Sequence, residues 1–418
     1  MVRIPIAIVG AGGMGGRHLR ALGALYESGM ANVELVAVCD LREDNAIHLA
    51  DLAEQMLGSR PQVFTSMETM KKQRPDIEAV DITTDSGSHH KVAEMAFELG
   101  YNVLCEKPLS LTVRGCNRVI DAWKKSGKVL SVGEQERRDP MCRLNKALID
   151  AGVIGKPYAF LLGSASGGSD IIIWPWRHYK NIGGIFVDAG VHAVDQIMYY
   201  MGDIEEVFAV SKIWEPKRYR GERIGVANFY DHWAKEVPNE IDADAEDMVI
   251  STLKFKSGAV GQWTSFYAAH GEPMRYGMIY GSKGSMEPAK QRRGDPLSVT
   301  IDGVGKITGD EVLELVPDFY LDELPARLFG SDRIGSYAGR VPFEDADRFL
   351  VALEYYELGQ CIADGTTPEV DAYVGRKDLA VCNAALESSV LGRPVTIEEI
   401  ENEQTAEYEK SINAHWKI

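Results

Sequence analysis

The sequence predicts an α/β protein with two domains, an N-terminal Rossmann domain with a doubly wound parallel sheet and a C-terminal α+β domain with a mostly antiparallel open sheet. Short apolar segments alternate with amphipathic ones up to residue 135, as strands and helices do in a doubly wound sheet. Beyond that point several extended segments follow one another directly. The 418 residues also exceed what one core usually holds, so we expect domains at 1–135 and 136–418.

The N-terminal domain is expected to begin with a buried strand that leads into a glycine cluster and a helix. The predicted strands are Ile4–Val9, Val33–Cys39, Ala79–Thr83, Tyr101–Cys105 and Lys128–Val132. The spacing of apolar residues predicts amphipathic helices at Lys91–Leu99 and Val113–Lys125.

The second domain is expected to open with a helix over Met141–Ala151. The predicted strands are Pro157–Leu162, Val207–Ile213, Met248–Phe255, Ala259–Phe266 and Arg275–Tyr280, with turns at Gly258 and Gly281–Gly284. Segments 214–245 and 291–342 lack strong periodicity and are predicted to be long insertions. The predicted C-terminal helices are Phe343–Ala363, Ala372–Leu391 and Ile397–Trp416, which are candidates to pack back on the first domain.

Composition argues against several classes of protein. The chain has 45 Lys and Arg against 62 Asp and Glu, a net charge of −17, which repels nucleic acids and anionic lipid surfaces. Its six cysteines form no Cys-x-x-Cys pair, so we expect reduced thiols and a cytoplasmic protein. The apolar segment at residues 4–9 is too short for a signal peptide, and no later one is long enough to span a bilayer.

A glycine-rich loop follows the first predicted strand and fits the pattern G-x-G-x-x-G. In that pattern the first glycine makes a tight turn, the second lets a pyrophosphate approach the backbone, and the third packs the helix against the strand. The free N–H groups of the helix N-terminus then bind the phosphates. The loop residues expected to bind the cofactor are Gly10, Gly12, Gly13, Met14 and Gly15.

Asp40 ends the second predicted strand, where a carboxylate accepts hydrogen bonds from the adenosine ribose and repels a 2′-phosphate. NAD is therefore favoured over NADP. Arg42 lies close enough to contact a phosphate, although a solvated surface arginine is the simpler interpretation.

Two further motifs are distinctive. Cys105-Glu106-Lys107-Pro108-Leu109 contains Glu-Lys-Pro, and residues 183–195 contain a paired glycine followed by D-x-G-x-H-x-x-D. Both motifs resemble signatures of the glucose-fructose oxidoreductase, inositol dehydrogenase and MocA (Gfo/Idh/MocA) family. The resemblance covers nearly the whole chain, with a departure at Asp85, where the family commonly has proline. Further residues expected at the cofactor are Thr83, Thr84, His89, Glu106, Lys107 and Gln135.

Three residues are the candidates for catalysis. Oxidation of an alcohol needs a base for the hydroxyl proton and a cation near the oxygen. His192 can be the base, and Lys107 can position the hydroxyl and stabilise alkoxide charge at the carboxyl edge of the sheet. Asp188 precedes His192 by four residues, so on a helix it is expected to orient the imidazole or to share its proton. The resemblance implies the same three residues.

The segment before the second signature is the candidate substrate loop. Aromatic rings stack on the apolar faces of sugars, and Arg or Lys can bind an anionic group. The residues proposed to contact substrate are Trp174, Trp176, Arg177 and Tyr179, together with Lys107, Asp188 and His192. A packed loop at a subunit contact explains the segment equally well. Asp188, His192 and Asp195 share a helix face that imitates a metal site, but without clustered His or Cys no metal is predicted.

These observations predict an enzyme that transfers hydride between nicotinamide and a secondary hydroxyl of a sugar, sugar derivative or cyclitol. One alternative is an NAD-dependent glycosidase that oxidises its substrate, eliminates the aglycone and then reduces the product. Another is a non-catalytic sugar or dinucleotide sensor. Relatives cover their open sheet by pairing subunits, so a homodimer or homotetramer is expected. The sequence leaves open the substrate, the carbon that is oxidised and the direction of the reaction.

Overall fold

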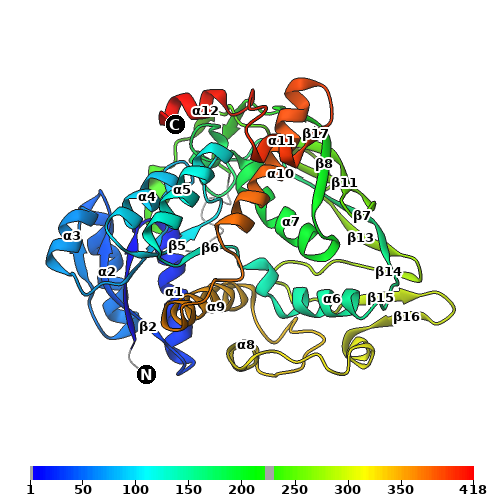
Figure 1. The fold of residues 1–418 in the computed structure, drawn as a ribbon, viewed down its shortest axis with the longest axis horizontal. Coiled ribbons are helices and arrows are strands. Elements are labelled where there is room, and N and C mark those ends of the chain that lie inside the picture. The colour runs from blue at the N-terminus through cyan, green and yellow to red at the C-terminus, as the bar shows by residue number, and fades with distance from the viewer. Residues whose placement is uncertain (1–2, 222–229) are drawn as a thin grey trace.

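Two large sheets organise the protein, as seen in a computed structural model that describes residues 3–221 and 230–418 (Figure 1). The N-terminal sheet has six parallel strands in the order β3-β2-β1-β4-β5-β6. Its strands are β1 (Ile4–Val9), β2 (Val33–Cys39), β3 (Gln62–Phe64), β4 (Ala79–Ile82), β5 (Asn102–Glu106) and β6 (Leu130–Gly133). The strand order reverses between β1 and β4, which is where doubly wound sheets bind ligands.

Helices cover both faces of this sheet, because the crossover connections between its parallel strands run over those faces. They are α1 (Gly13–Glu27), α2 (Glu43–Leu57), α3 (Met67–Gln73), α4 (His89–Glu98) and α5 (Val113–Ser126). The predicted doubly wound fold is confirmed, although α2, β3 and α3 were not among the predicted elements.

The second sheet has nine strands in the order β16-β15-β14-β13-β7-β12-β11-β8-β17. All its neighbouring pairs are antiparallel except β7 and β12, so the prediction of a mostly antiparallel sheet is confirmed. Its strands are β7 (Pro157–Gly167), β8 (Ile204–Lys212), β11 (Met248–Phe255), β12 (Val260–Ala269), β13 (Met274–Gly281), β14 (Gly284–Met286), β15 (Ser298–Ile301), β16 (Gly305–Thr308) and β17 (Val395–Thr396).

The two predicted insertions contain structure of their own. Segment 214–245 holds the strand pair β9 (Lys217–Tyr219) and β10 (Glu240–Asp242) and the 3-10 helix η3 (Asp231–Glu236), while residues 222–229 lie outside the described part of the chain. Segment 291–342 includes β15, β16, the 3-10 helix η4 (Gly309–Leu315) and α8 (Glu323–Phe329). The other helical elements before it are η1 (Glu136–Arg138), α6 (Pro140–Asp150), η2 (Pro175–His178) and α7 (Ile185–Met201).

The C-terminal helices connect the two halves. Helix α9 (Phe343–Asp364) packs against α1, and α10 (Ala372–Leu391) contacts both α5 and β8 (Figure 1). The prediction of one helix over Ile397–Trp416 is wrong, because α11 (Ile397–Glu401) and α12 (Lys410–Trp416) are separate. Glu403 between them has a φ of 53°, which an α-helix cannot contain, and the buried carboxylate of Glu387 accepts backbone N–H groups from this connection.

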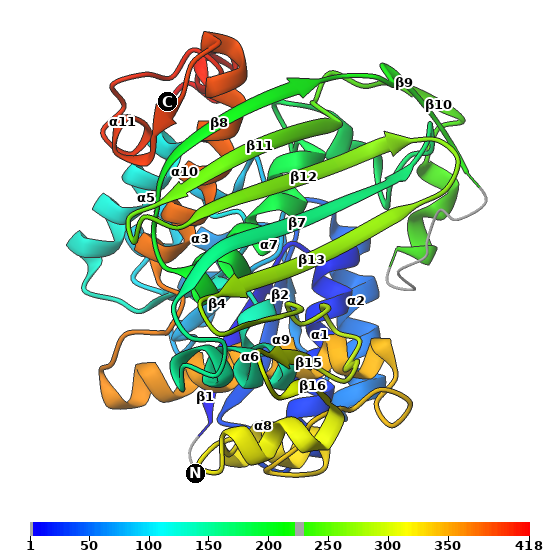
Figure 2. The same ribbon diagram turned by 90° about the vertical axis from the view of Figure 1, so that its right-hand side faces the viewer.

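One face of the nine-stranded sheet lies against α7 and α10, and the opposite face is open toward the viewer in Figure 2. Apolar side chains are exposed on the sheet, among them Phe208, Val210, Ile250 and Val260. Val210 lies directly opposite Ile250 on the neighbouring strand. Among the described residues, no helix is both long and apolar enough to cross a bilayer.

Candidate active site

A cavity of about 800 Å³ lies between the carboxyl edge of the parallel sheet and the inner side of the second domain. Helix α1 and the loops after β4, β5 and β6 form one wall, and β7, β12 and α7 form the other. The predicted site residues that line it are Met14, Thr84, His89, Glu106, Lys107, Gln135, Trp176, Arg177, Asp188 and His192. The structure therefore brings together residues that lie almost 180 positions apart in the sequence.

The glycine loop has the geometry that a dinucleotide requires. Gly10 has a φ of 105°, and a Cβ there would lie 2.7 Å from the backbone of Thr83. A Cβ on Gly15 would lie 2.4 Å from the carbonyl oxygen of Gly10, whereas no described residue lies within 4 Å of the corresponding position at Gly12. Among the described residues no side chain caps the first turn of α1, and this turn contains no acidic residue. The space beside Gly12 and the N–H groups at the start of α1 fit a bound pyrophosphate.

Asp40 lies at the carboxyl end of β2 beside this loop. Its Oδ2 accepts a hydrogen bond from the Ala11 N–H at 2.6 Å, and its Oδ1 accepts one from the Arg42 N–H at 2.8 Å. The Arg42 guanidinium contacts Asp44 and Glu236 and stays half exposed. Arg42 is thus a surface residue whose charge is already paired.

Thr83, Thr84 and His89 shape the loop after β4. The Thr83 hydroxyl donates to the carbonyl oxygen of Gly10 at 2.7 Å, which ties this loop to the glycine turn. The ring of His89 contacts the carbonyl oxygens of Pro108 at 2.8 Å and Thr84 at 3.2 Å. These residues hold the backbone around the cavity in place.

The negative charge of Glu106 is neutralised by two cations of α1, Arg17 and His18. Its Oε1 lies 3.1 Å from Arg17 and 2.9 Å from His18, and its Oε2 accepts the Lys107 N–H. Burial raises the pKa of Glu106, but the bond to His18 and the charges of His18 and Arg17 outweigh it and hold that pKa well below its usual range. Arg17 also pairs with Asp347, so α1, β5 and α9 meet in one buried charge network.

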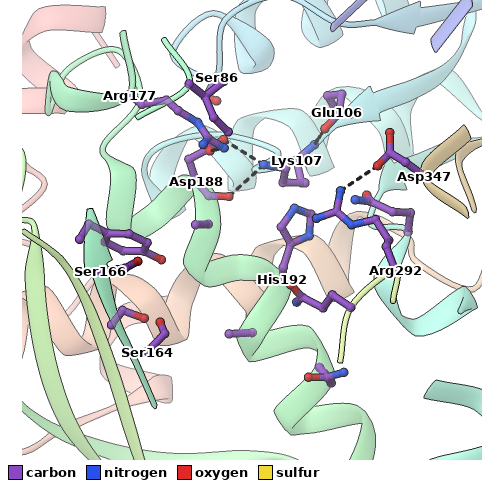
Figure 3. A pocket seen from close by; sticks show the side chains of 18 of the residues that line it. Ser86, Glu106, Lys107, Ser164, Ser166, Arg177, Asp188, His192, Arg292 and Asp347 are labelled. Atoms are coloured by element: carbon purple, nitrogen blue, oxygen red, sulfur yellow. Dashed lines mark hydrogen bonds and ion pairs between the residues drawn. The ribbon is translucent and has the colours of Figure 1, made fainter. Parts of the chain in front are cut away.

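Lys107 and Asp188 form the centre of the site (Figure 3). Lys107 Nζ donates to both the carbonyl oxygen and Oδ1 of Asp188 at 2.9 Å each. Arg177 forms an ion pair with the other carboxylate oxygen of Asp188. Burial raises the pKa of Asp188, but the two cations outweigh it and hold that pKa below its ordinary value. Lysine has three N–H donors, so one remains for a ligand.

His192 contacts a different carboxylate from the one that the sequence predicts. Its Nδ1 lies 2.8 and 2.7 Å from the two carboxylate oxygens of Glu134, which follows β6 and is 1% exposed. Asp188 shares a face of α7 with His192 but is directed to Lys107 and Arg177 (Figure 3). The imidazole therefore contacts the carboxylate of Glu134 and makes no hydrogen bond to that of Asp188. Nε2 makes no hydrogen bond with any residue that the structure describes.

Burial and nearby cations set the charge of His192. Burial, followed by the charge of Lys107, lowers the pKa of His192 to about 3. Burial raises the pKa of Glu134 to about 7. Arg292 lies beside the imidazole and forms ion pairs with Glu136 at 3.1 Å and Asp347 at 2.8 Å (Figure 3). His192 is thus a neutral ring among fixed charges.

The substrate side of the cavity combines an aromatic ring with hydroxyl groups. Trp176 lines the cavity and packs against Gly183, where a Cβ would lie 2.4 Å from the ring. Ser164 and Ser166 extend from β7 into the same space, and among the described residues neither side-chain hydroxyl has a hydrogen-bond partner (Figure 3). Trp174 and Tyr179 do not line the cavity and pack instead in a small core with Ile171, Val237 and Ile241.

The insertion before β10 supplies residues that the sequence analysis missed. Tyr230 lines the cavity, and its ring would lie 2.4 Å from a Cβ at Gly13. Trp233 Nε1 donates to Asn45 on α2 at 3.0 Å. No periodic pattern marks this segment, so only its aromatic content could have drawn attention to it.

Two other polar residues of the region differ in their contacts. Gln135 is buried and lines the cavity, and its Oε1 accepts no hydrogen bond from any described residue. Asp195 is bound by Arg137. Within the described ranges, no group of three or more His, Cys, Asp or Glu is placed to hold a metal ion.

Comparison with known proteins gives the same assignment for both halves of the chain. Residues 4–134 match a model described as an oxidoreductase family with an NAD-binding Rossmann fold, and residues 143–287 match the GFO/IDH/MocA C-terminal domain. Myo-inositol 2-dehydrogenase of Thermotoga maritima is 30% identical over 67% of this chain and 73% of that protein. The scyllo-inositol 2-dehydrogenase (NAD(+)) of Bacillus subtilis is 25% identical over 95% and 97%. A levoglucosan dehydrogenase solved with NADH and L-sorbose has the same fold, with a TM-score of 0.74, 24% identity and coverage of 95% and 100%.

Proposed function

This chain belongs to the Gfo/Idh/MocA family of NAD-binding oxidoreductases, and we propose that it oxidises a secondary hydroxyl of a sugar, sugar derivative or cyclitol. The observation that carries the proposal is the meeting of Lys107, Asp188 and His192 in the cavity that the glycine loop borders. Relatives named as inositol and levoglucosan dehydrogenases support this substrate class. The hydroxyls of Ser164 and Ser166, which have no hydrogen-bond partner in the described part of the chain, suit a ligand rich in hydroxyl groups.

Each residue has a separate task in the proposed reaction. NAD, when bound, supplies the hydride acceptor. His192 takes the hydroxyl proton at Nε2, because its Nδ1 is engaged by Glu134. Lys107 donates its remaining N–H to the substrate oxygen and stabilises the negative charge that develops there. Asp188 holds the ammonium group of Lys107 in place, and Arg177 holds the carboxylate of Asp188.

NAD is proposed as the cofactor in preference to NADP because Asp40 lies at the end of β2, where the adenosine ribose of a Rossmann cofactor binds. We propose a domain boundary at residue 135, after which η1 and α6 begin the second domain. The six cysteines are buried and unpaired, which fits a reducing compartment such as the cytoplasm. The exposed apolar residues of the large sheet fit a homodimer or homotetramer that pairs these faces (Figure 2).

A labelling experiment separates simple oxidation from glycoside cleavage. Wild-type protein with NAD is incubated in deuterated water with free sugars, methyl glycosides and inositols. A dehydrogenase forms NADH in proportion to a keto product, and turnover introduces no deuterium at the neighbouring carbon. Glycoside cleavage instead releases the aglycone, accumulates no NADH and leaves solvent deuterium beside the oxidised carbon, because elimination removes a proton there. The second result would replace the proposed function by the glycosidase alternative.

A further inference from the structure

We propose that Glu134 is the positioning residue of His192, whose buried carboxylate accepts the Nδ1–H and so leaves Nε2 bare toward the cavity. The inference rests on the proposed function of His192 as the base. It concerns a residue outside the two sequence signatures, on the turn after β6.

The geometry carries the proposal. Both carboxylate oxygens of Glu134 lie within 2.8 Å of Nδ1, and Glu134 is 1% exposed. Glu134 follows β6 of the parallel sheet and His192 lies on α7, so the bond joins the two walls of the cavity. A second bond holds the carboxylate itself, since the Glu136 N–H donates to its Oε1 at 3.1 Å. The imidazole is thereby fixed from the side away from the substrate.

The proton positions follow from the donors and acceptors. A carboxylate only accepts, so with Glu134 ionised the hydrogen of neutral His192 must lie on Nδ1. Nε2 then has a free lone pair, which a base requires. When Nε2 takes the alcohol proton, the ring becomes an imidazolium, and the negative charge of Glu134 stabilises it at the moment it forms.

Several other charges surround the pair. Lys107 and Arg292 lower the pKa of His192 after the larger effect of burial, while Glu136 and Asp188 raise it. Around Glu134 the nearby charges are Lys107, Arg137, Glu106, Asp195 and Asp378. Because burial raises the pKa of Glu134 to about 7, the pair gains one proton as the pH falls through that value. If the proton binds to Glu134, the acceptor of the Nδ1–H is lost. If it binds to His192, Nε2 no longer has a free lone pair. In both cases oxidation should slow below about pH 7.

The first test reads the tautomer directly and needs no substrate. Protein labelled with ¹⁵N-histidine is studied by NMR at pH 8 with NAD present, and the His192 signals are assigned by their loss in His192→Gln. We expect His192 to carry its proton on Nδ1 in the wild type, and Glu134→Gln to change the His192 signals. A wild-type ring protonated on Nε2, or His192 signals that Glu134→Gln leaves unchanged, would overturn the proposal.

The second test uses the pH dependence of kcat/KM for a polyol that the wild type oxidises. In Glu134→Gln the charge of the pair is lost, so we expect the acid limb to move to lower pH by more than about one unit and the plateau to fall at least about tenfold. Glu134→Asp should restore part of the plateau, because the charge is retained. An acid limb and plateau identical to those of the wild type would contradict the proposal.

Glu357→Gln is the matched control. Glu357 pairs with Arg138 of the same turn at 2.8 Å but does not line the cavity, so its variant should keep the wild-type acid limb. NAD titration and thermal unfolding of each variant distinguish a positioning effect from failure to fold. If the wild type oxidises no sugar or inositol at all, the proposed function fails, whereas the tautomer measurement still decides the role of Glu134.

Discussion

Two histidines, His18 on α1 and His192 on α7, differ in charge. His18 is 0% exposed and contacts Asp81 and Glu106 at 2.9 Å each. Burial lowers its pKa, but the two carboxylates outweigh burial and raise that pKa to about 10. Burial and the charge of Lys107 lower the pKa of His192 to about 3. His18 is therefore a permanent cation, whereas His192, whose side chain is 12% exposed, is a neutral ring.

The difference in charge corresponds to a difference in role: His18 stabilises the fold, and His192 is the proposed base. His18 neutralises carboxylates that lie at the ends of β4 and β5, and it does not line the cavity. His192 lines the cavity and keeps one nitrogen free among the described residues. Neighbouring charges, and not burial alone, decide which histidine can act as a base.

The largest expected effect concerns the region around His192. His192→Ala and Lys107→Ala should each lower turnover by about 10²–10⁴-fold, because each removes a group that acts on the reacting hydroxyl. Both variants should still bind NAD, since the glycine loop is unchanged. NADH formation measures turnover, and a fluorescence titration measures NAD binding. Wild-type turnover in either variant would show that the residue has no role in the reaction. For His192, it would also remove the difference between a catalytic histidine and the structural His18.

A substitution at His18 should affect stability instead. His18→Gln leaves Asp81 and Glu106 without their shared cation, and loss of one partner of a buried ion pair costs about 3–5 kcal/mol in the free energy of unfolding. Because the pKa of His18 is raised, its contribution is complete below its unfolded pKa near 6.5 and is lost as the pH rises through about 10. The gap between wild type and variant should therefore be largest near pH 6 and shrink toward pH 10.

Urea unfolding at pH 6, 8 and 10 measures this gap. His270→Gln is the matched control, because His270 contacts Glu215 at 2.8 Å while its side chain is 65% exposed. An exposed pair contributes only about 0–1 kcal/mol, so this variant should unfold nearly as the wild type does. If His18→Gln showed the same stability loss at every pH, its effect would come from packing and not from charge.

Sequence patterns predict the region around His192 better than the region around His18. Lys107 follows a buried strand at the ligand-binding edge and lies in a motif, so it was found from the sequence. Glu134 follows β6 at the same edge and could have been found by the same reasoning, but it belongs to neither signature. No sequence pattern assigns a role to His18, because its carboxylate partners are 63 and 88 residues away.

The same distinction applies to the fold. β1, β2 and β11 have the bounds that the sequence predicts, because apolar residues and turn residues mark them locally. The break between α11 and α12 depends on Glu387 of α10, which accepts the N–H groups of Glu407 and Tyr408. Arg292 reaches His192 from an insertion without periodicity. Such long-range contacts leave no local pattern in the sequence.

The smallest expected effect lies at the adenosine end, where solvent screens charge more than it does around the two histidines. Asp40 accepts backbone N–H groups from Ala11 and Arg42, and serine can keep one such acceptor without the charge. We expect the wild type to bind NAD more tightly than NADP, and Asp40→Ser to narrow the ratio of the two Kd values by about tenfold, which corresponds to about 1.4 kcal/mol.

Isothermal titration of both dinucleotides provides the ratio at fixed salt, because the repulsion weakens as ionic strength rises. Asp51→Ser is the control: Asp51 lies on α2 and pairs with Arg60 at the surface, so its loss should leave the ratio unchanged. Equal affinities for NAD and NADP in the wild type would refute the role of Asp40. An unchanged ratio in Asp40→Ser would show that the shape of the β2 edge, and not its charge, selects the cofactor. If the preference for NAD disappears at high salt, the charge of Asp40 is screened by solvent ions. The buried carboxylates around His18 and His192 differ in this respect, because solvent ions do not reach them.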